Sequence, residues 1–198
     1  MKRKLQENTW KSDFGNAYTD RNLGDDRINI TGYDLIKNKI NLKSAIEFGS
    51  NIGLNLDALK IIYPGIKTFG IEINKSAFNL LKKRHEGTNC SIIDYNENKK
   101  YELSLICGVL IHQNPKNLKK IYSKLFNSSS KYIYIREYFN DKPVALDYRG
   151  KKDLLFKRDF AFDLISLYPN LKLVDYGFHW KHDKLKKCDN ENWFLFSK

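Results

Sequence analysis

The sequence predicts an α/β fold in which helices cover both faces of a mostly parallel sheet. Apolar runs of strand length alternate with segments whose apolar residues recur at helical spacing. These runs are almost continuously apolar, as expected for parallel strands that are buried on both faces. A chain of 198 residues is long enough to bury the core of one such domain.

The first five predicted strands are interleaved with three predicted helices. The strands are Ser44–Phe48, Thr68–Ile73, Cys90–Ile93, Leu103–Leu110 and Tyr132–Arg136, and the helices are Leu54–Ile62, Ala77–Lys83 and Leu118–Leu125. The first helix ends at Tyr63-Pro64-Gly65, because Pro cannot continue a helix and Gly favours its end.

The C-terminal segment has a different order. A helical pattern over Asp159–Tyr168 precedes two strand-like runs, Leu171–His179 and Trp193–Phe196, which a polar segment joins. Two consecutive strands joined in this way can pair as an antiparallel hairpin at the edge of a sheet. The sequence therefore predicts about seven strands, the last of them antiparallel.

The charge indicates acidic partners. The chain has 35 Lys and Arg against 23 Asp and Glu, a formal charge of +12, which suits nucleic acid, anionic sugars or phosphates. The basic residues are scattered and accompany many Asn and Ile, a mixture that biased nucleotide composition of the gene also explains. The absence of a dense basic stretch argues against nucleic acid.

The cysteines and the apolar runs indicate a cytoplasmic protein without a membrane span. Cys90, Cys107 and Cys188 are widely spaced, and the first two lie in apolar runs, as free thiols in a reducing compartment do. No CxxC or His/Cys pair suggests a metal. No run approaches 18 apolar residues, and the basic N-terminus lacks an apolar signal segment.

A glycine turn follows the first strand, in the sequence Glu47-Phe-Gly49-Ser-Asn51-Ile-Gly53. It matches neither the P-loop nor Gly-x-Gly-x-x-Gly. Glu47 would repel a pyrophosphate and attract a cationic ligand such as one with an ammonium group. Gly49 allows a tight turn and close approach of a ligand, and Asn51 is the residue after Gly that best tolerates a left-handed conformation.

Two more acids follow the next two strands. Glu72 ends the second predicted strand, where a carboxylate can accept both hydroxyls of a ribose. Asp94 ends the third, where it could accept an adenine amino group. Each acid alone could equally be a solvated carboxylate or a helix cap. Three acids at the ends of successive strands, after a glycine turn, favour a nucleoside site.

This pattern, over roughly residues 40–138, resembles the class I S-adenosylmethionine-dependent methyltransferases. The resemblance implies a Rossmann-like seven-stranded sheet and S-adenosylmethionine as cofactor. A departure is Asn51, which stands where a middle glycine is usual. The cofactor-binding residues that it implies are Glu47, Gly49, Asn51, Gly53, Glu72, Ile73, Asp94, Tyr95 and Cys107.

A closer resemblance spans nearly the whole chain. It rests on "SDFGNAYTDRN" at 12–22, "GVLIHQNP" at 108–115, "EYFN" at 137–140, "YRG" at 148–150, "LFKRDFA" at 155–161 and "LVDYGF" at 173–178. Together these segments are similar to the methylases associated with pseudaminic acid biosynthesis. The resemblance implies a small acidic sugar as acceptor: a nonulosonic acid or its precursor, destined for surface glycans.

Within one domain of residues 1–198, we expect an N-terminal arm or lid (1–27), a cofactor-binding half (28–138), and an acceptor-side loop followed by the C-terminal strands (139–198). Tyr18, Arg21 and Asn22 could close over the cofactor and bind its methionine carboxylate, or the arm could only pack on the domain. The sequence gives no indication of oligomeric state.

His112, just beyond the fourth predicted strand, is the candidate general base, with Glu137 and Tyr138 facing the same cleft. The alternatives are a structural His at a helix entrance and a pair at the edge of the core.

Four residues are candidates for binding an acidic acceptor: Tyr148, Arg149, Lys157 and Arg158. An arginine fork holds a carboxylate at two points, although a solvated basic loop would have the same composition. Two further functions stay open: methylation of nucleic acid or another small molecule, and a binding module without catalysis.

Overall fold

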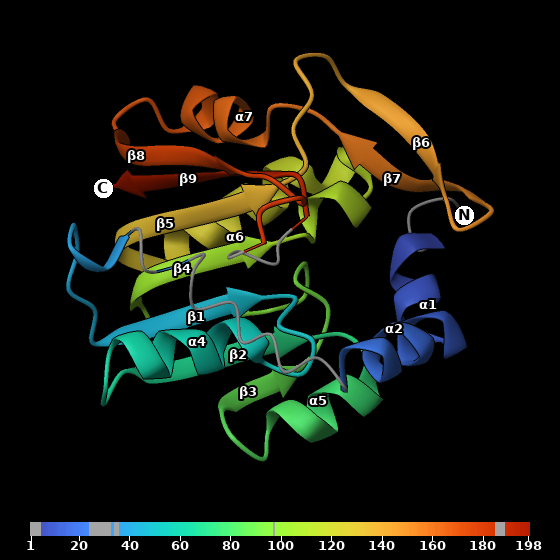
Figure 1. Ribbon diagram of the computed structural model, residues 1–198, viewed down its shortest axis with the longest axis horizontal. Helices are drawn as coiled ribbons and strands as arrows, with labels where there is room; N and C mark the ends of the chain where they lie inside the picture. Colours follow the sequence, from blue (N-terminus) through green and yellow to red (C-terminus); the bar gives the residue numbers. More distant parts are fainter. Residues whose placement is uncertain (1–4, 24–32, 34–35, 97, 185–188) are drawn as a thin grey trace.

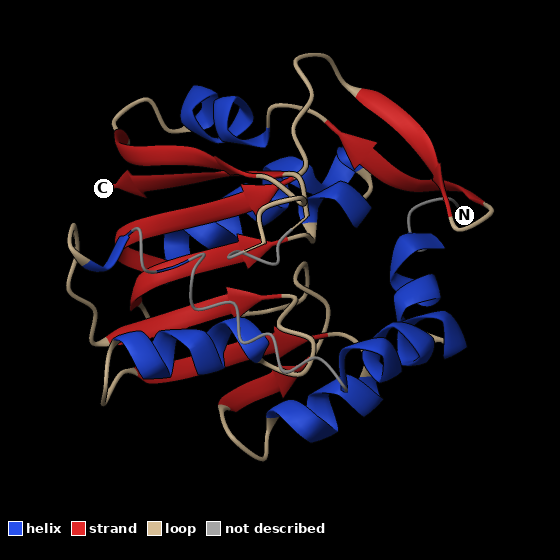
Figure 2. Ribbon diagram, viewed as in Figure 1, coloured by secondary structure: helices blue, strands red, loops and turns tan. Residues whose placement is uncertain are grey.

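The computed structural model describes residues 5–23, 33, 36–96, 98–184 and 189–198. In this part of the chain seven strands form one sheet in the order β3-β2-β1-β4-β5-β9-β8 (Figures 1 and 2). The strands are β1 Ser44–Phe48, β2 Lys67–Glu72, β3 Glu86–Asn89, β4 Tyr101–Cys107, β5 Ser129–Glu137, β8 Lys172–His179 and β9 Glu191–Ser197.

The sheet is parallel from β3 to β5 and antiparallel where β9 meets its neighbours. β1 pairs with β2 and β4, so the loops after these strands meet at one edge of the sheet. β9 lies antiparallel between β5 and β8, which forms the edge. The predicted α/β fold with seven strands and a final antiparallel strand is confirmed.

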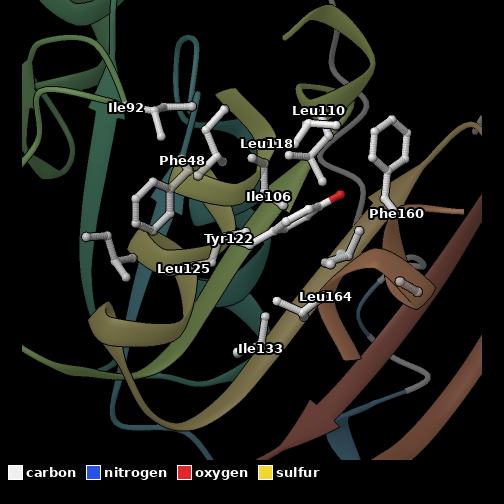
Figure 3. Packing of buried hydrophobic residues seen from close by; sticks show 14 of the residues in the cluster. Phe48, Ile92, Ile106, Leu110, Leu118, Tyr122, Leu125, Ile133, Phe160 and Leu164 are labelled. Carbon is white, nitrogen blue, oxygen red and sulfur yellow. The ribbon is translucent and has the colours of Figure 1, made fainter. Parts of the chain in front are cut away.

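Four helices flank the sheet: α4 Leu54–Ile62, α5 Lys75–Leu81, α6 Leu118–Ser128 and α7 Phe160–Leu167. On one face Leu56 and Leu59 of α4 pack with Ala45, Leu103 and other buried residues of the sheet. The opposite face buries the apolar sides of α6 and α7, and Figure 3 shows Phe48, Ile106, Leu118, Tyr122, Leu125 and Leu164 gathered there. Helices thus cover both faces.

Two smaller parts lie beside the carboxyl ends of the parallel strands. The N-terminal arm consists of α1 Leu5–Lys11 and α2 Asp13–Leu23, and β6 Val144–Tyr148 pairs with β7 Lys151–Lys157 in a separate hairpin. Figure 1 shows the tip of this hairpin next to α1. Gln6 Nε2 of α1 donates to the Asp153 carbonyl of β7 at 2.9 Å, which joins the two parts.

Two sequence-based expectations about elements were wrong. The third strand is Glu86–Asn89, not Cys90–Ile93: Ile92 and Ile93 are buried in a turn, so their apolar character reflects packing and not strand pairing. Residues 144–157 form a hairpin and not a loop. In its two strands only Leu154 is buried, so they lack the buried apolar run that marks β1, β4 and β5.

Among the described residues, no helix has both the length and the apolar character needed to cross a membrane.

Candidate functional site

A cleft opens where the loops after the parallel strands meet the N-terminal arm. The loops contribute Gly49, Asn51, Ile71–Asn74, Ser91, Ile92, Cys107–Val109, His112 and Gln113, and the arm contributes Glu7, Trp10, Gly15 and Tyr18. It encloses about 760 Å³, including its open mouth. Ligands of open α/β sheets bind at this edge, outside the carboxyl ends of the strands.

The glycine turn has the backbone that its sequence requires. Gly49, Asn51 and Gly53 all have positive φ, at 77°, 48° and 93°. A Cβ on Gly49 would lie 2.6 Å from Val109 Cγ2, so this glycine also permits the loop after β4 to pack against the turn. The turn therefore needs glycine at Gly49 for both its conformation and its packing.

Glu72 is buried at the end of β2 and fixes the turn to its own strand. Its Oε2 accepts from the Asn51 backbone N–H and its Oε1 from that of Asn74, both at 2.7 Å. Burial raises the pKa of Glu72, while these N–H donors oppose the rise. Each carboxylate oxygen can accept more than one hydrogen bond, so Glu72 can still receive hydroxyl groups of a ligand in the cleft.

Glu47 lies beneath the turn and is not among the residues that line the cleft. Its Oε1 accepts from Asn55 Nδ2 at 2.6 Å, and its Oε2 has no hydrogen-bond partner among the described residues. Burial raises the pKa of Glu47 to about 8, although Asn55 and the nearby Arg136 lower it. Arg136 Nη2 in turn donates to Asn55 Oδ1 at 3.1 Å, which links the acid to a buried cation.

The arm reaches the cleft through Asn74. The Asn74 Nδ2 donates to the Trp10 carbonyl at 3.0 Å and to Asn16 Oδ1 at 2.9 Å, while its Oδ1 accepts from the Ala77 N–H and caps α5. Tyr18 lines the cleft, and Asn22 hydrogen-bonds to it. The exposed Arg21 lies over the Tyr18 ring, with Cζ 5.5 Å from its centroid.

The structure places Asp94 and Tyr95 away from this cleft. Because β3 ends at Asn89, Asp94 is five residues beyond it; it is exposed and lies with Tyr95 in a separate surface pocket beside Phe69 and Tyr101. Ser91 and Ile92 occupy the position after β3 in the cleft instead. Ile73, by contrast, lines the cleft as expected from its place beside Glu72.

Cys107 and His112 bound the cleft after β4. The Cys107 Sγ lies 3.4 Å from the Tyr33 hydroxyl, and burial raises the pKa of this thiol to about 12. His112 is buried, with Nδ1 2.6 Å from the Leu154 carbonyl. Because a carbonyl only accepts, Nδ1 carries the proton and Nε2 the lone pair. Burial lowers the pKa of His112 to about 4, so the ring is neutral at pH 7.

Glu137 and Tyr138 do not face the cleft. Glu137 Oε1 accepts from the backbone N–H groups of Val109 and Leu110 at 2.9 and 2.8 Å, and Oε2 accepts from Ile111 at 3.4 Å. Burial raises the pKa of Glu137 to about 8 against these donors. The Tyr138 hydroxyl donates to Asp189 Oδ2 at 2.7 Å. Glu137 therefore supports the loop around His112 from behind, whereas Tyr138 contacts the segment before β9.

The predicted basic cluster is divided. Arg149 occupies the tip of the hairpin, whereas Lys157 and Arg158 follow its far end, roughly 20 Å away along seven extended residues of β7. Arg158 already forms a two-point ion pair with Asp163, at 2.7 Å from Nε to Oδ2 and 3.1 Å from Nη2 to Oδ1. Lys157 Nζ lies over the Tyr138 ring at 5.1 Å. The expectation of a single site built by all three residues was wrong.

Sequence reasoning missed several residues of the cleft: Glu7, Trp10, Gly15, Asn74, Ser91, Ile92, Val109 and Gln113. Asn74 carries a detectable signal, because an Asn before a helical apolar pattern is a common N-cap. Trp10 and Glu7 carry none, since their position depends on how the arm folds back on the domain.

Comparison with solved structures identifies the fold. A 1,6-didemethyltoxoflavin-N1-methyltransferase from Burkholderia thailandensis, with its acceptor and S-adenosylhomocysteine bound, superposes with a TM-score of 0.72 over 96% of this chain and 88% of that one, at 13% identity. The fold is that of the class I S-adenosylmethionine-dependent methyltransferases. No family model and no curated protein matches the sequence.

Two further structures show the same methyltransferase fold. Magnesium protoporphyrin IX methyltransferase from Synechocystis, with S-adenosylmethionine bound, has a TM-score of 0.68 at 11% identity over 99% of this chain and 96% of that one. A methyltransferase from Archaeoglobus fulgidus has a TM-score of 0.67 at 12% identity, covering 93% and 100%. The acceptors named for such proteins differ widely, so the methyltransferase fold itself leaves the acceptor undefined.

Proposed function

We propose that this protein is an S-adenosylmethionine-dependent methyltransferase. The observation that carries the proposal is the glycine turn with positive φ at Gly49, Asn51 and Gly53, joined through Asn51 to the buried acid Glu72 on the wall of the cleft. This arrangement lies at the edge of the sheet where a fold of this class accepts a nucleoside.

The residues around the cleft fit the parts of the cofactor. Glu72 offers acceptors to the ribose hydroxyls, and Ser91 with Ile92 takes the position next to it where an adenine ring would lie. Tyr18 and the cation Arg21 suit the methionine carboxylate. Beneath the turn, Oε2 of Glu47 has no hydrogen-bond partner among the described residues, and a ligand with ammonium and sulfonium charges nearby would lower the raised pKa of this carboxyl and favour its ionised form.

His112 is our candidate base. When bound, the cofactor supplies a methyl carbon for in-line displacement. The Leu154 carbonyl fixes the Nδ1 proton of His112, which leaves Nε2 free to accept a proton from a hydroxyl or amine of the acceptor. The rings of Trp10 and Tyr148, each with its centroid 4.8 Å from that of His112, shield the imidazole from water.

For the acceptor we propose a small acidic carbohydrate, a nonulosonic acid or a precursor, methylated on nitrogen or oxygen. Support comes from the sequence resemblance described above and from the cationic residues at the mouth of the cleft. The acceptor class is a separate step from the cofactor assignment, because solved structures with this fold act on acceptors as different as a toxoflavin precursor and a porphyrin.

Two measurements test the proposal in order. Calorimetry with S-adenosylhomocysteine should show saturable binding, and its absence in the folded protein would contradict the cofactor assignment. Incubation with methyl-labelled cofactor and a panel of nonulosonic acids, nucleotide-activated sugars and nucleic acids, followed by mass spectrometry, should then label a sugar acid. If only nucleic acid became labelled, the methyltransferase assignment would stand and the proposal of a sugar acceptor would be wrong.

A further inference from the structure

Five aromatic side chains from three distant segments meet at the mouth of the cleft. Trp10 contacts Phe14 and Tyr18 of the arm edge to face, with centroids 5.5 and 5.4 Å apart. The Trp10 and Tyr148 rings each lie 4.8 Å from His112, and Phe14 lies 6.1 Å from Tyr148. Phe14 and Tyr148 thus bring the arm and the hairpin to the side of the candidate base.

Two cations lie over the outer pair of these rings. Lys151 Nζ is 5.0 Å from the centroid of Phe14, and Arg149 Cζ is 5.7 Å from that of Tyr148. Both cationic side chains belong to exposed residues, and in the part of the chain that the structure describes neither forms a salt bridge. Arg158 and Arg136, in contrast, are paired with Asp163 and Glu191.

The hairpin tip, residues 148–151, fixes the backbone from which both cationic side chains extend. Tyr148 pairs with Lys151 across a two-residue turn in which Arg149 and Gly150 have φ of 50° and 74°. Positive φ at both central residues is the geometry of a tight hairpin turn that matches the twist of its strands. The Leu154 carbonyl of the same β7 strand holds His112, so the tip and the candidate base share one support.

The carboxylates that line the cleft already have partners. Glu7 Oε1 accepts from Ser91 Oγ at 2.5 Å, and Glu72 accepts backbone N–H groups. The mouth therefore combines aromatic faces with two cations that form no ion pair with any described residue. Arg in particular binds a carboxylate at two points, and the adjacent rings offer a face against which a sugar or a planar body can stack.

We propose that the hairpin tip and the arm form the acceptor subsite, in which Arg149 and Lys151 hold a carboxylate while Phe14 and Tyr148 contact the body of the acceptor. This inference rests on the proposed methyltransferase function. The acceptor site predicted from the sequence combined Arg149 with Lys157 and Arg158. The subsite proposed here keeps Arg149 and adds Lys151 and Phe14.

Calorimetry in the presence of saturating S-adenosylhomocysteine tests the subsite with two matched pairs of probes. One pair is N-acetylneuraminic acid and its methyl ester, and the other is 4-hydroxybenzoic acid and its methyl ester. We expect at least one acid to bind at least tenfold more tightly than its ester, and the pair that does so distinguishes a sugar body from a planar one. Binding of both acids no tighter than of their esters, or no binding of either acid at 10 mM, overturns the proposal.

Two variants and one control locate the effect. Arg149→Gln and Lys151→Gln should each weaken binding of the preferred acid at least fivefold and leave its ester unchanged. The control, Lys152→Gln, alters the neighbouring exposed lysine, which lies over no aromatic ring of the described residues, and should change acid binding less than twofold. An effect of the control equal to that of Lys151→Gln refutes a defined subsite. The affinity for S-adenosylhomocysteine, measured separately, tests the proposed function and should stay unchanged in all three variants.

Discussion

The two sides of the cleft are built in different ways. The cofactor side, consisting of the glycine turn with Glu72–Asn74, is held within 26 consecutive residues by short hydrogen bonds from backbone N–H groups to the buried Glu72 carboxylate. The acceptor side joins the arm, His112 and the hairpin tip, which are separated by about 100 and 36 residues in the chain. Its contacts are mainly between rings, and its cations are exposed.

This difference indicates where each kind of specificity resides. A rigid, backbone-bonded edge can present fixed donors and acceptors to an invariant ligand, because its geometry costs little to maintain on binding. A wall assembled from surface segments can change its side chains without disturbing the sheet. We therefore expect substitutions on the cofactor side to affect stability and cofactor affinity together, and those on the acceptor side to affect acceptor binding or rate without changing cofactor affinity.

The largest effect should come from Glu137, which supports the loop between the two sides. Glu137→Ala removes the acceptor for three buried backbone N–H groups and should lower the free energy of unfolding by about 2–4 kcal/mol. Glu137→Gln keeps one acceptor oxygen and should lose less than half as much. Urea denaturation measures both. If both variants lost little stability but had a much lower kcat, Glu137 would instead take part in catalysis.

Glu72→Ala should weaken the binding of S-adenosylhomocysteine by about 2–3 kcal/mol, roughly 30- to 150-fold, because it removes a charged acceptor that also fixes Asn51. Calorimetry on the folded variant gives the affinity. Glu86→Ala, which removes an exposed acid at the start of β3, is the control and should bind normally. A folded Glu72→Ala protein with affinity within threefold of wild type would contradict the cofactor site.

Gly49→Ala and Gly65→Ala separate backbone strain from packing. Both glycines have positive φ, so each alanine costs roughly 1 kcal/mol of strain. An added Cβ meets Val109 at 2.6 Å at Gly49 and open space at Gly65. In thermal unfolding, Gly49→Ala should therefore lower the stability by about 1–2 kcal/mol more than Gly65→Ala does. Gly49→Ala should also weaken cofactor binding, and Gly65→Ala should not. Equal losses would show that the contact between the turn and Val109 relaxes freely.

His112→Ala should lower kcat at least about tenfold while cofactor affinity stays unchanged. Since burial lowers the pKa of His112 to about 4, the neutral base is fully available at pH 6 and above. As the pH is lowered, kcat should fall through protonation of His112 only near pH 4. With an ordinary imidazole as the base, kcat would already fall between pH 7.5 and 6. A pH–rate profile with a limb at pH 6–7.5 that disappears in His112→Gln would show that the ligand-bound site raises this pKa again.

The same pKa gives a sign for the dependence of stability on pH. Between pH 4 and 6.5 the unfolded chain binds a proton at His112 that the folded chain does not. His112 therefore favours folding less as the pH falls through this range. His112→Gln should remove that part of the pH dependence, which urea denaturation at pH 4.5 and 7 can detect. An unchanged difference between the two pH values would assign it to other groups.

The sequence by itself determined the features that depend on neighbouring residues in the chain. Alternating apolar runs predict the layered sheet, because buried strands and helices each require their own periodicity. Glycine and Asn at 49, 51 and 53 predict positive φ, and all three have it, since that conformation excludes most other side chains. The place of Glu72 at the end of β2 followed from the same strand pattern.

Only the tertiary structure decided the direction of side chains whose partners are distant in sequence. Glu137 ends a strand as Glu72 does, yet its carboxylate accepts from the N–H groups of the loop after β4. Arg149 and Arg158 are close in sequence, but the extended strand β7 separates them. Trp10 reaches His112 because Asn74 binds the arm. Local periodicity carries no information on such contacts, since they depend on how whole elements pack against each other.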